Sequence, residues 1–252
     1  MVRLNTNSNT SIKGALSSGK YPLIKSCLGK YIKFVLNLSN RREFDIVKML
    51  EMKNGWQMLE SLLKRVLLIL GISCQELVRS FGLKTDLISK EPEKFYDIFN
   101  EFMTIVKLHE KRFEGFKKIK PRRRDGIRVA DFVACYKSNK YAIEIKTIRQ
   151  SEIEEKARIK PGLAYNVDTL KEMLKDKLKD ILYLVKNQLD ATARKERCRK
   201  KLFAIWIRRK ASLFLLNLKR DDYGQIYNSV KEDFPSIDYF LFNGNNWYPQ
   251  NP

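Results

Sequence analysis

Hydrophobic positions recur with a helical period in the first part of the chain. Between residues 41 and 70, apolar side chains return every three or four positions, and Gly71 follows where such a helix would end. A serine and a glutamate at capping-box spacing predict a short helix over 75–81. A third helix, opened by a proline, is predicted over 92–115. The polar residues 1–20 are expected to be loose, so this part is predicted to be mainly helical.

After residue 115 the pattern changes to short runs of β-branched and aromatic residues separated by polar turns. Strands are predicted over 127–136, 140–148, 201–207 and 212–218. A long helix is predicted over 169–197, and Asn243–Gly244 predicts a hairpin turn among C-terminal aromatic residues. Helix, strands, helix and strands in this order are typical of an α/β fold with a mixed sheet flanked by helices.

The change of pattern divides the chain into two predicted regions. Residues 1–91 form a basic, mostly helical region, and residues 92–252 an α/β core that ends in the aromatic hairpin. The chain carries 50 Lys and Arg against 29 Asp and Glu, a net charge of +21, and 44% of its residues are hydrophobic. This apolar content excludes disorder as the main state, and the charge indicates a polyanionic partner, with nucleic acid first. No acid precedes Glu43, which favours a basic arm that touches nucleic acid, with organelle targeting as the alternative.

Residue counts exclude several common types of site. A single histidine, His109, cannot build a two-histidine zinc site, and its place on an apolar helix face predicts a packed core residue. The cysteines form no closely spaced pair, which indicates isolated thiols in a reducing compartment, the cytoplasm. They are Cys27, Cys74, Cys135 and Cys198. No apolar run approaches the ~18 residues of a membrane span, so no membrane-spanning segment is expected.

Candidate chemistry is concentrated in two neighbouring predicted strands. Asp131 lies in the first strand, and Glu144 and Lys146 lie two residues apart in the second, so that the latter two share a face. If the strands form a hairpin with Tyr136 opposite Tyr141, Asp131 lies opposite Lys146 and diagonal to Glu144. A register slip of one residue would separate the three side chains onto different faces.

Two carboxylates at one place repel each other unless a divalent cation lies between them. Mg²⁺ takes oxygen ligands at about 2.0–2.1 Å and is commonly held by one or two carboxylates plus a substrate phosphate. A bound metal lowers the pKa of water and stabilises charge on the phosphate, while a nearby lysine can position that water. Asp131, Glu144 and Lys146 therefore predict Mg²⁺-dependent phosphodiester hydrolysis, with Mn²⁺ as a substitute.

An acid followed by hydrophobic-Glu-hydrophobic-Lys resembles the PD-(D/E)XK nuclease superfamily, whose restriction-endonuclease-like core is αβββαβ. The matching residues are Asp131, Glu144 and Lys146. The predicted elements over roughly 92–218, with a further strand around 116–120 that the resemblance implies, fall in the family's order. Ala130 stands where the family often has proline. The resemblance implies that the two acids bind the metal and that the lysine orients the attacking water.

The resemblance also suggests further site residues. It implies the backbone carbonyl of Ile145 as a third metal ligand. Some members add a glutamate from the first core helix, for which Glu110 and Glu114 are candidates, and Glu110 is closer to the apolar face. Some carry a glutamine in the later helix with a tyrosine four residues on. Gln188 matches the glutamine, whereas residue 192 is Thr192.

For function, the resemblance implies DNA hydrolysis that leaves 5′-phosphate and 3′-hydroxyl ends. We expect an endonuclease of restriction or defence type, or of repair or recombination, with a homodimer as a plausible assembly and RNA as an alternative substrate. Candidate phosphate contacts flank the two strands, with solvated turns as the alternative reading; they are Arg122, Arg123, Arg124 and Arg149. Two other classes remain open: a non-catalytic nucleic-acid-binding protein on a similar α/β fold, and a basic scaffold bound to a ribonucleoprotein or an anionic membrane surface.

Overall fold

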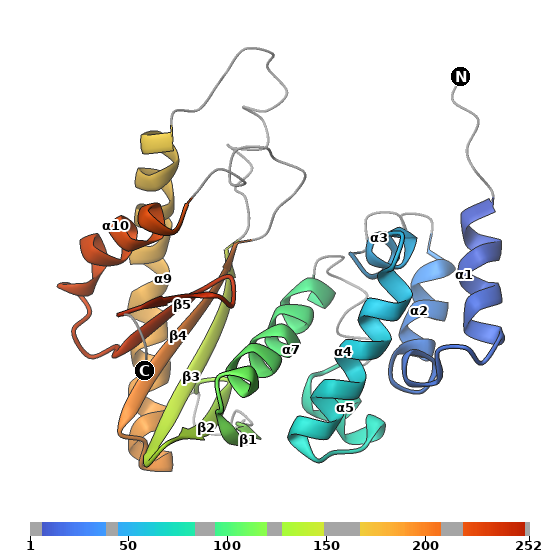
Figure 1. The fold of residues 1–252 in the computed structure, drawn as a ribbon, viewed down its shortest axis with the longest axis horizontal. Coiled ribbons are helices and arrows are strands. Elements are labelled where there is room, and N and C mark those ends of the chain that lie inside the picture. The colour runs from blue at the N-terminus through green and yellow to red at the C-terminus, as the bar shows by residue number, and fades with distance from the viewer. Residues whose placement is uncertain are drawn as a thin grey trace. The chain divides into compact units, whose positions relative to one another are not determined.

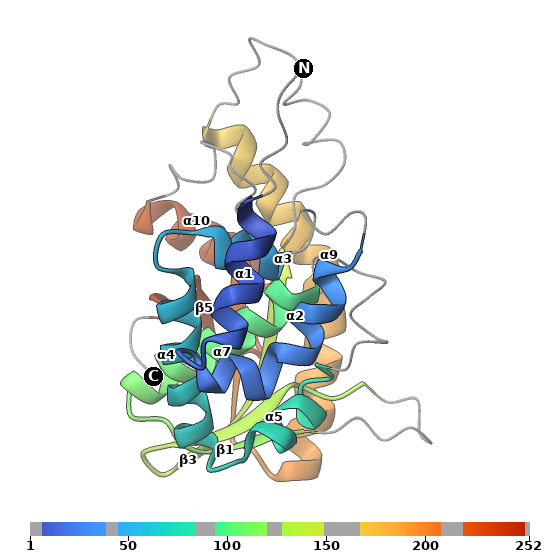
Figure 2. The ribbon, with the colours of Figure 1, turned by 90° about the vertical axis from the view of Figure 1, so that its right-hand side faces the viewer.

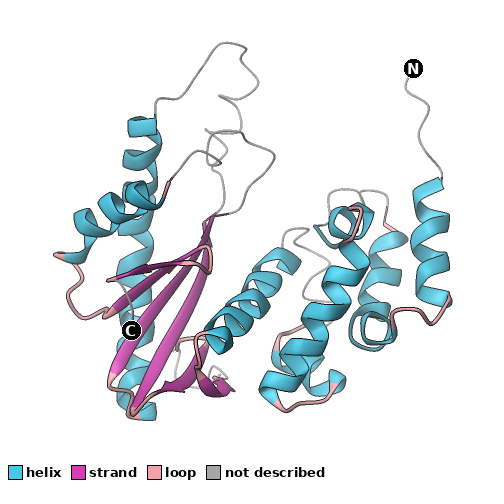
Figure 3. Cartoon of the chain, viewed as in Figure 1, coloured by secondary structure: helices cyan, strands magenta, loops and turns pink. Residues whose placement is uncertain are grey.

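A computed structural model of the chain describes residues 7–38, 45–83, 94–119, 128–148, 167–207 and 219–249. Within these ranges the chain forms eight α-helices, one π-helical segment and six strands, which confirms an α/β protein. The chain divides into two compact units, Met1–His109 and Glu110–Pro252 (Figure 1). The described part of the first unit is helical, and all six strands lie in the second (Figure 3).

The first unit is a set of short helices. They are α1 (Asn7–Ser17), η1 (Ile24–Leu28, π-helical), α2 (Gly29–Leu36), α3 (Asp45–Glu51), α4 (Gly55–Leu70), α5 (Cys74–Ser80) and α7 (Lys94–Glu110). Helices α1 and α2 run side by side (Figures 1 and 2). Helix α1 contradicts the expectation of a loose start, because Ile12 and Leu16 lie one turn apart on it and are both buried.

The continuous helix expected over 41–70 is two helices, α3 and α4, separated by a turn over 52–54. A Cβ on residue 55 would lie 1.8 Å from the carbonyl oxygen of Met49, so only glycine fits where the backbone segments approach. Gly71 ends α4 in the left-handed conformation, with φ of 61°, which confirms the predicted end.

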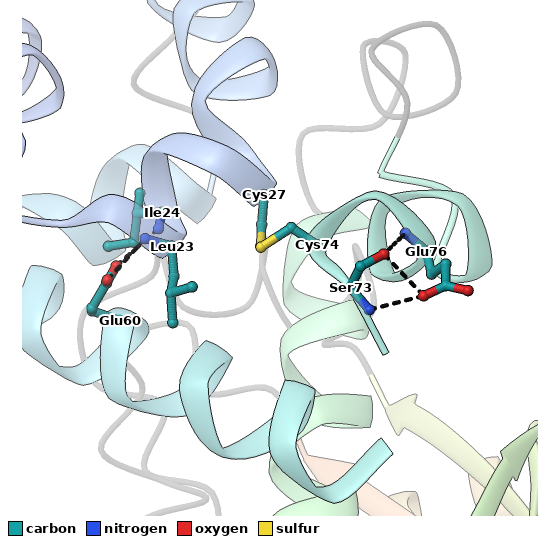
Figure 4. Close-up of a disulfide and its surroundings, with 7 residues drawn as sticks. All are labelled: Leu23, Ile24, Cys27, Glu60, Ser73, Cys74 and Glu76. Carbon is teal, nitrogen blue, oxygen red and sulfur yellow. Dashed lines mark hydrogen bonds between the residues drawn. A yellow bond between two sulfur atoms is a disulfide. The ribbon is translucent and has the colours of Figure 1, made fainter. Parts of the chain in front are cut away.

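A disulfide links two helices of the first unit (Figure 4). Cys27 of η1 is bonded to Cys74 at the start of α5, whereas Cys135 and Cys198 in the second unit are free. The expectation of four isolated thiols was therefore wrong for two of them, because cysteines 47 residues apart are joined only by the fold. Disulfides persist mainly in oxidising compartments, and a cytoplasmic location stays a prediction.

Two carboxylates hold backbone N–H groups close to this disulfide (Figure 4). Glu60 of α4 accepts from the N–H groups of Leu23 and Ile24 at 2.9 and 2.8 Å, which satisfies donors where η1 begins. Ser73 and Glu76 form the predicted capping box at the start of α5, with the Glu76 carboxylate 2.9 Å from the Ser73 nitrogen.

Helix α7 belongs to the first unit, although the sequence pattern groups it with the α/β region. Phe95 stacks on Tyr31 with ring centroids 6.0 Å apart, and Phe102 lies 4.9 Å from Phe81. These aromatic contacts explain why the boundary falls at the end of the helix. His109 is exposed, which contradicts the expectation of a packed core residue, because it lies next to the helix end and off the buried stripe.

The second unit is built on a mixed sheet whose strands are neighbours in the order of the sequence. They are β1 (Glu114–Lys118), β2 (Phe132–Tyr136), β3 (Asn139–Ile148), β4 (Lys200–Ile207), β5 (Tyr239–Phe242) and β6 (Asn246–Tyr248). The pairs β3–β4 and β4–β5 are parallel, and the other neighbouring pairs are antiparallel. Strands β1 to β4 and helix α9 (Val167–Glu196) confirm the corresponding predicted elements.

Helices α9 and α10 (Arg220–Lys231) pack against one face of this sheet. The hydrophobic cluster between them and the strands includes Leu178, Leu182, Val185, Phe203, Ile205, Tyr223, Ile226, Phe240 and Phe242. Helix α10 was not predicted, and the strand expected over 212–218 lies outside the described residues. Burial of a complete apolar stripe fixes α9 along the sheet, and that helix supports the candidate site described below.

The C-terminal aromatic residues form part of the core of the second unit. Asn243 and Gly244 make the predicted hairpin turn, with φ of 49° and 74°. Trp247 and Tyr248 are buried, and Trp247 stacks on Phe113 with centroids 6.1 Å apart. No helix in the described ranges is both long and apolar enough to cross a membrane.

Candidate active site

The β2–β3 hairpin sets the position of the candidate acids. Its turn has two residues, so that Tyr136 pairs with Asn139 and Phe132 with Ile143. The expected pairing of Tyr136 with Tyr141 was wrong by two positions, because Lys137 adopts a φ of 51° and closes a tighter turn. Continued by one residue, the observed register brings Asp131 opposite Glu144 rather than Lys146. A slip of an even number of residues keeps the face, so the side chains still meet.

Asp131 stands immediately before β2 and is held by backbone contacts. Its N–H donates to Glu144 Oε2 at 3.1 Å, and its Oδ2 accepts the N–H of Ile145 at 2.9 Å. Its carbonyl oxygen accepts the N–H of Ile119 at 2.9 Å. The Asp131 carboxylate is partly exposed, so it remains accessible while its position is fixed from both neighbouring strands.

Glu144 is a fully buried carboxylate, with 0% of the residue exposed. Its Oε1 forms an ion pair with Lys146 Nζ, and its other oxygen receives the Asp131 N–H. Burial, followed by the negative charge of Asp131, raises the pKa of Glu144 to about 8, and the positive charges of Lys146 and Lys118 oppose that rise. Two carboxylates and a lysine therefore meet here, as the sequence predicted, and the buried acid stays ionised at neutral pH only with help from a cation.

A second lysine, which the sequence analysis missed, lies on the Asp131 side of this group. Lys118 of β1 places its Nζ 3.5 Å from Asp131 Oδ1 and 4.4 Å from the ring centroid of Phe132. Only 16% of its side chain is exposed. No sequence signal identified it, because a lysine in a short strand is ordinarily a solvated residue.

Two side chains of helix α9 hold the backbone of residues 129–130, immediately before Asp131. The Thr192 hydroxyl, fully buried, accepts the N–H of Ala130 at 2.7 Å. Gln188 lies one turn before Thr192 on this helix, and its Nε2 is 3.4 Å from the carbonyl oxygen of Val129. Gln188 thus contacts the backbone that leads into the site, and Thr192, at the position where some members of the resembled family have a tyrosine, makes the shorter contact.

The carboxylates of Asp131 and Glu144 supply two of the oxygen ligands that a hard divalent cation needs. Carboxylate oxygens are the ligands that Mg²⁺ prefers, and a cation beside Glu144 would compensate its burial. Ile145 lies between Glu144 and Lys146 on β3, and a role for its carbonyl stays a prediction. Glu110 ends α7 and Glu114 begins β1, both with exposed side chains, and Glu110 as a ligand also stays a prediction. Within the described ranges, no group of three or more Asp, Glu, His or Cys residues could hold a metal.

The candidate phosphate contacts cannot be placed. Arg122, Arg123, Arg124 and Arg149 lie outside the described residues. Their role as nucleic-acid contacts stays a prediction.

A second carboxylate–lysine cluster lies in the same unit and offers a contrast. Glu196, at the end of α9, pairs with Lys117 at 3.1 Å and with Lys140 at 3.4 Å. The hydrogen bond from Lys117 is the largest influence that holds the pKa of Glu196 below its usual range. This cluster contains one acid between two cations, so it is an ordinary structural ion pair, unlike the paired acids at Asp131 and Glu144.

Comparison of the chain with models of protein families, with curated proteins and with solved structures finds no match in any of the three. The chemistry available to the site therefore follows from its own groups. They are two adjacent carboxylates, one of them fully buried, with a lysine beside each.

Proposed function

We propose that the protein is a metal-dependent nuclease that hydrolyses DNA phosphodiester bonds. The observation that carries this proposal is the meeting of Asp131, Glu144 and Lys146: the backbone N–H of Asp131 donates to the Glu144 carboxylate, Lys146 pairs with that carboxylate, and Glu144 is fully buried. Placing two acids together in a poorly hydrated position is costly, and binding a divalent cation is a common reason for it. The net charge of +21 supplies an attractive field for a polyanion.

Each group has a distinct chemical role in this proposal. Asp131 and Glu144 hold Mg²⁺, together with the Ile145 carbonyl, and Mn²⁺ can substitute. The metal, when bound, acidifies water and stabilises charge on the phosphate. Lys146, which pairs with Glu144 in the structure, would orient the attacking water toward phosphorus. The products expected are 5′-phosphate and 3′-hydroxyl ends.

The order of elements supports a restriction-endonuclease-like core. Helix α7, strands β1 to β3, helix α9 and strand β4 follow one another as in the αβββαβ arrangement of the PD-(D/E)XK nucleases that the sequence resembles. Asp131 stands immediately before β2 and Glu144 stands within β3, in the order along the chain that the resemblance implies. We therefore infer an endonuclease, of restriction and defence or of repair and recombination. A homodimer remains part of this proposal.

A non-catalytic nucleic-acid-binding protein is the second candidate. The observation in its favour is the direct ion pair between Glu144 and Lys146, which neutralises the buried acid without any metal. In that case the positive charge of the chain would bind the phosphate backbone, and the site would only stabilise the hairpin.

One cleavage assay separates the two. Purified protein is incubated with supercoiled plasmid and with labelled single- and double-stranded DNA and RNA, in Mg²⁺ or in EDTA, as wild type, Glu144→Ala and Lys146→Ala. The proposal predicts Mg²⁺-dependent cutting of DNA that both substitutions lower by at least about 100-fold. Salt-sensitive binding without cutting, unchanged in both variants, would establish the binding protein instead.

A further inference from the structure

The two lysines of the candidate site stand at opposite ends of a row that crosses three strands. Lys118 is on β1, Asp131 precedes β2, and Glu144 and Lys146 are on β3, with β2 between the other two strands in the sheet. Lys118 contacts Asp131, and Lys146 contacts Glu144. The acids are therefore in the middle and an ammonium group lies at each end.

We propose that Lys118 binds a non-bridging oxygen of the phosphate group whose ester bond is cleaved. This inference rests on the proposed nuclease function and assigns a substrate contact that the sequence resemblance does not supply. A phosphodiester carries a negative charge and would enter a site that already contains two carboxylates. Lys118 supplies positive charge on the Asp131 side, as Lys146 does on the Glu144 side.

The surroundings of Lys118 favour binding of an anion over simple solvation. Its ammonium lies above the ring of Phe132, and only 16% of its side chain is exposed. A cation at such a partly dehydrated position interacts more strongly with an anion than one in bulk water. Its 3.5 Å separation from Asp131 Oδ1 exceeds the usual hydrogen-bond length, so this weak contact can be exchanged for a phosphate oxygen when Asp131 Oδ1 binds a metal.

The neighbouring lysine provides a matched control. Lys117 pairs across the sheet with Val133 and Lys118 with Phe132, so the two side chains point to opposite faces. Lys117 is 62% exposed and its ammonium contacts Glu196. It has the same charge and is the next residue on the same strand, but its ammonium pairs with Glu196 and not with either of the two candidate acids.

Two measurements test this assignment on the full chain: the single-turnover rate of DNA cleavage in Mg²⁺, and the affinity for Mn²⁺ alone by calorimetry. They are made on wild type, Lys118→Met, Lys118→Arg and Lys117→Met. We expect Lys118→Met to lower the cleavage rate by about 100-fold, Lys118→Arg to lower it by less than about 10-fold, and Lys117→Met to leave it unchanged. Mn²⁺ should bind Lys118→Met at least as tightly as wild type, because a competing cation has been removed from Asp131.

The outcomes separate this inference from the proposed function. Wild-type cleavage combined with an unchanged rate in Lys118→Met overturns the role of Lys118 and leaves the nuclease intact. A joint loss of cleavage and of Mn²⁺ affinity in Lys118→Met also overturns it, since Lys118 would then only position Asp131. Absence of cleavage by wild type on every DNA substrate overturns both.

Discussion

The backbone N–H of Asp131 donates to the Glu144 carboxylate at 3.1 Å, while the Asp131 carboxylate accepts the N–H of Ile145 at 2.9 Å. These two reciprocal bonds fix both acids against backbone groups. The acids are thus placed by the register of the β2–β3 hairpin, with little freedom left to their side chains. Such preorganisation is what a metal-binding or catalytic group requires.

Glu144 makes the stability of the metal-free protein depend on pH. Its pKa is raised to about 8 by burial and by Asp131, so the folded state binds more protons than the unfolded state between about pH 4.5 and 8. The free energy of unfolding therefore falls as pH rises through this window, by about 1.4 kcal/mol for each unit by which the folded pKa exceeds the unfolded one. Glu144→Gln should remove this fall and be more stable than wild type at pH 8 in EDTA, as measured by urea unfolding.

The matched control is Glu196→Gln, in the cluster with Lys117 and Lys140. The pKa of Glu196 is lowered in the folded state, so its contribution has the opposite sign: it is present above the unfolded pKa and is lost as pH falls. Glu196→Gln should lower stability at pH 7 and not raise it at pH 8. Equal stability of wild type and Glu144→Gln at every pH would contradict the raised pKa.

Replacing Thr192 should lower both the stability and the activity of the protein more than replacing another buried threonine. Thr192→Val leaves the Ala130 N–H without its acceptor, which we expect to cost about 1–3 kcal/mol of unfolding free energy. The strand start that carries Asp131 should shift, and metal-dependent activity should fall by about 10-fold or more. Thr192→Ser should restore both quantities.

Thr104 is the matched control for this substitution. It is fully buried, and its hydroxyl donates to the carbonyl of Asn100 within the same helix, where that carbonyl keeps its backbone helix partner after Thr104→Val. We expect it to cost less than about 1 kcal/mol and to leave activity unchanged. Equal effects of the two valine substitutions on stability and activity would show that the contact to Ala130 has no special role.

Reduction of the Cys27–Cys74 disulfide should destabilise the first unit. The bond closes a loop with a sequence separation of 47, for which the chain-entropy model gives about 4 kcal/mol. Urea unfolding with and without a reductant measures this, and thiol titration in urea should find two reactive cysteines before reduction and four after it. Cys135→Ser, which removes a free thiol, should leave both the unfolding curve and its response to the reductant unchanged. Four thiols in the untreated protein would contradict the pairing.

The hairpin shows how far sequence reasoning reached. The strand pattern and the Glu-x-Lys spacing located β2 and β3 and brought Asp131, Glu144 and Lys146 together. Their exact partners depended on the turn, and a positive φ at Lys137 cannot be deduced from a lysine. The error was harmless only because the shift in register was even.

Other features were beyond the reach of local patterns. The Cys27–Cys74 pair and the Thr192–Ala130 contact join residues far apart in sequence, and each depends on helix packing. Lys118 became visible as a candidate only when β1 was seen beside Asp131. Helix α10 was missed because its apolar residues are few and spaced among polar ones.

The most direct test of the central claim compares two isosteric substitutions in the same unit. Single-turnover cleavage of end-labelled duplex DNA in Mg²⁺ is measured for wild type, Glu144→Gln and Glu196→Gln. The account predicts a loss of at least about 100-fold in Glu144→Gln and a rate within about 2-fold of wild type in Glu196→Gln. Cleavage by Glu144→Gln at the wild-type rate, or cleavage by wild type that persists in EDTA, would contradict it.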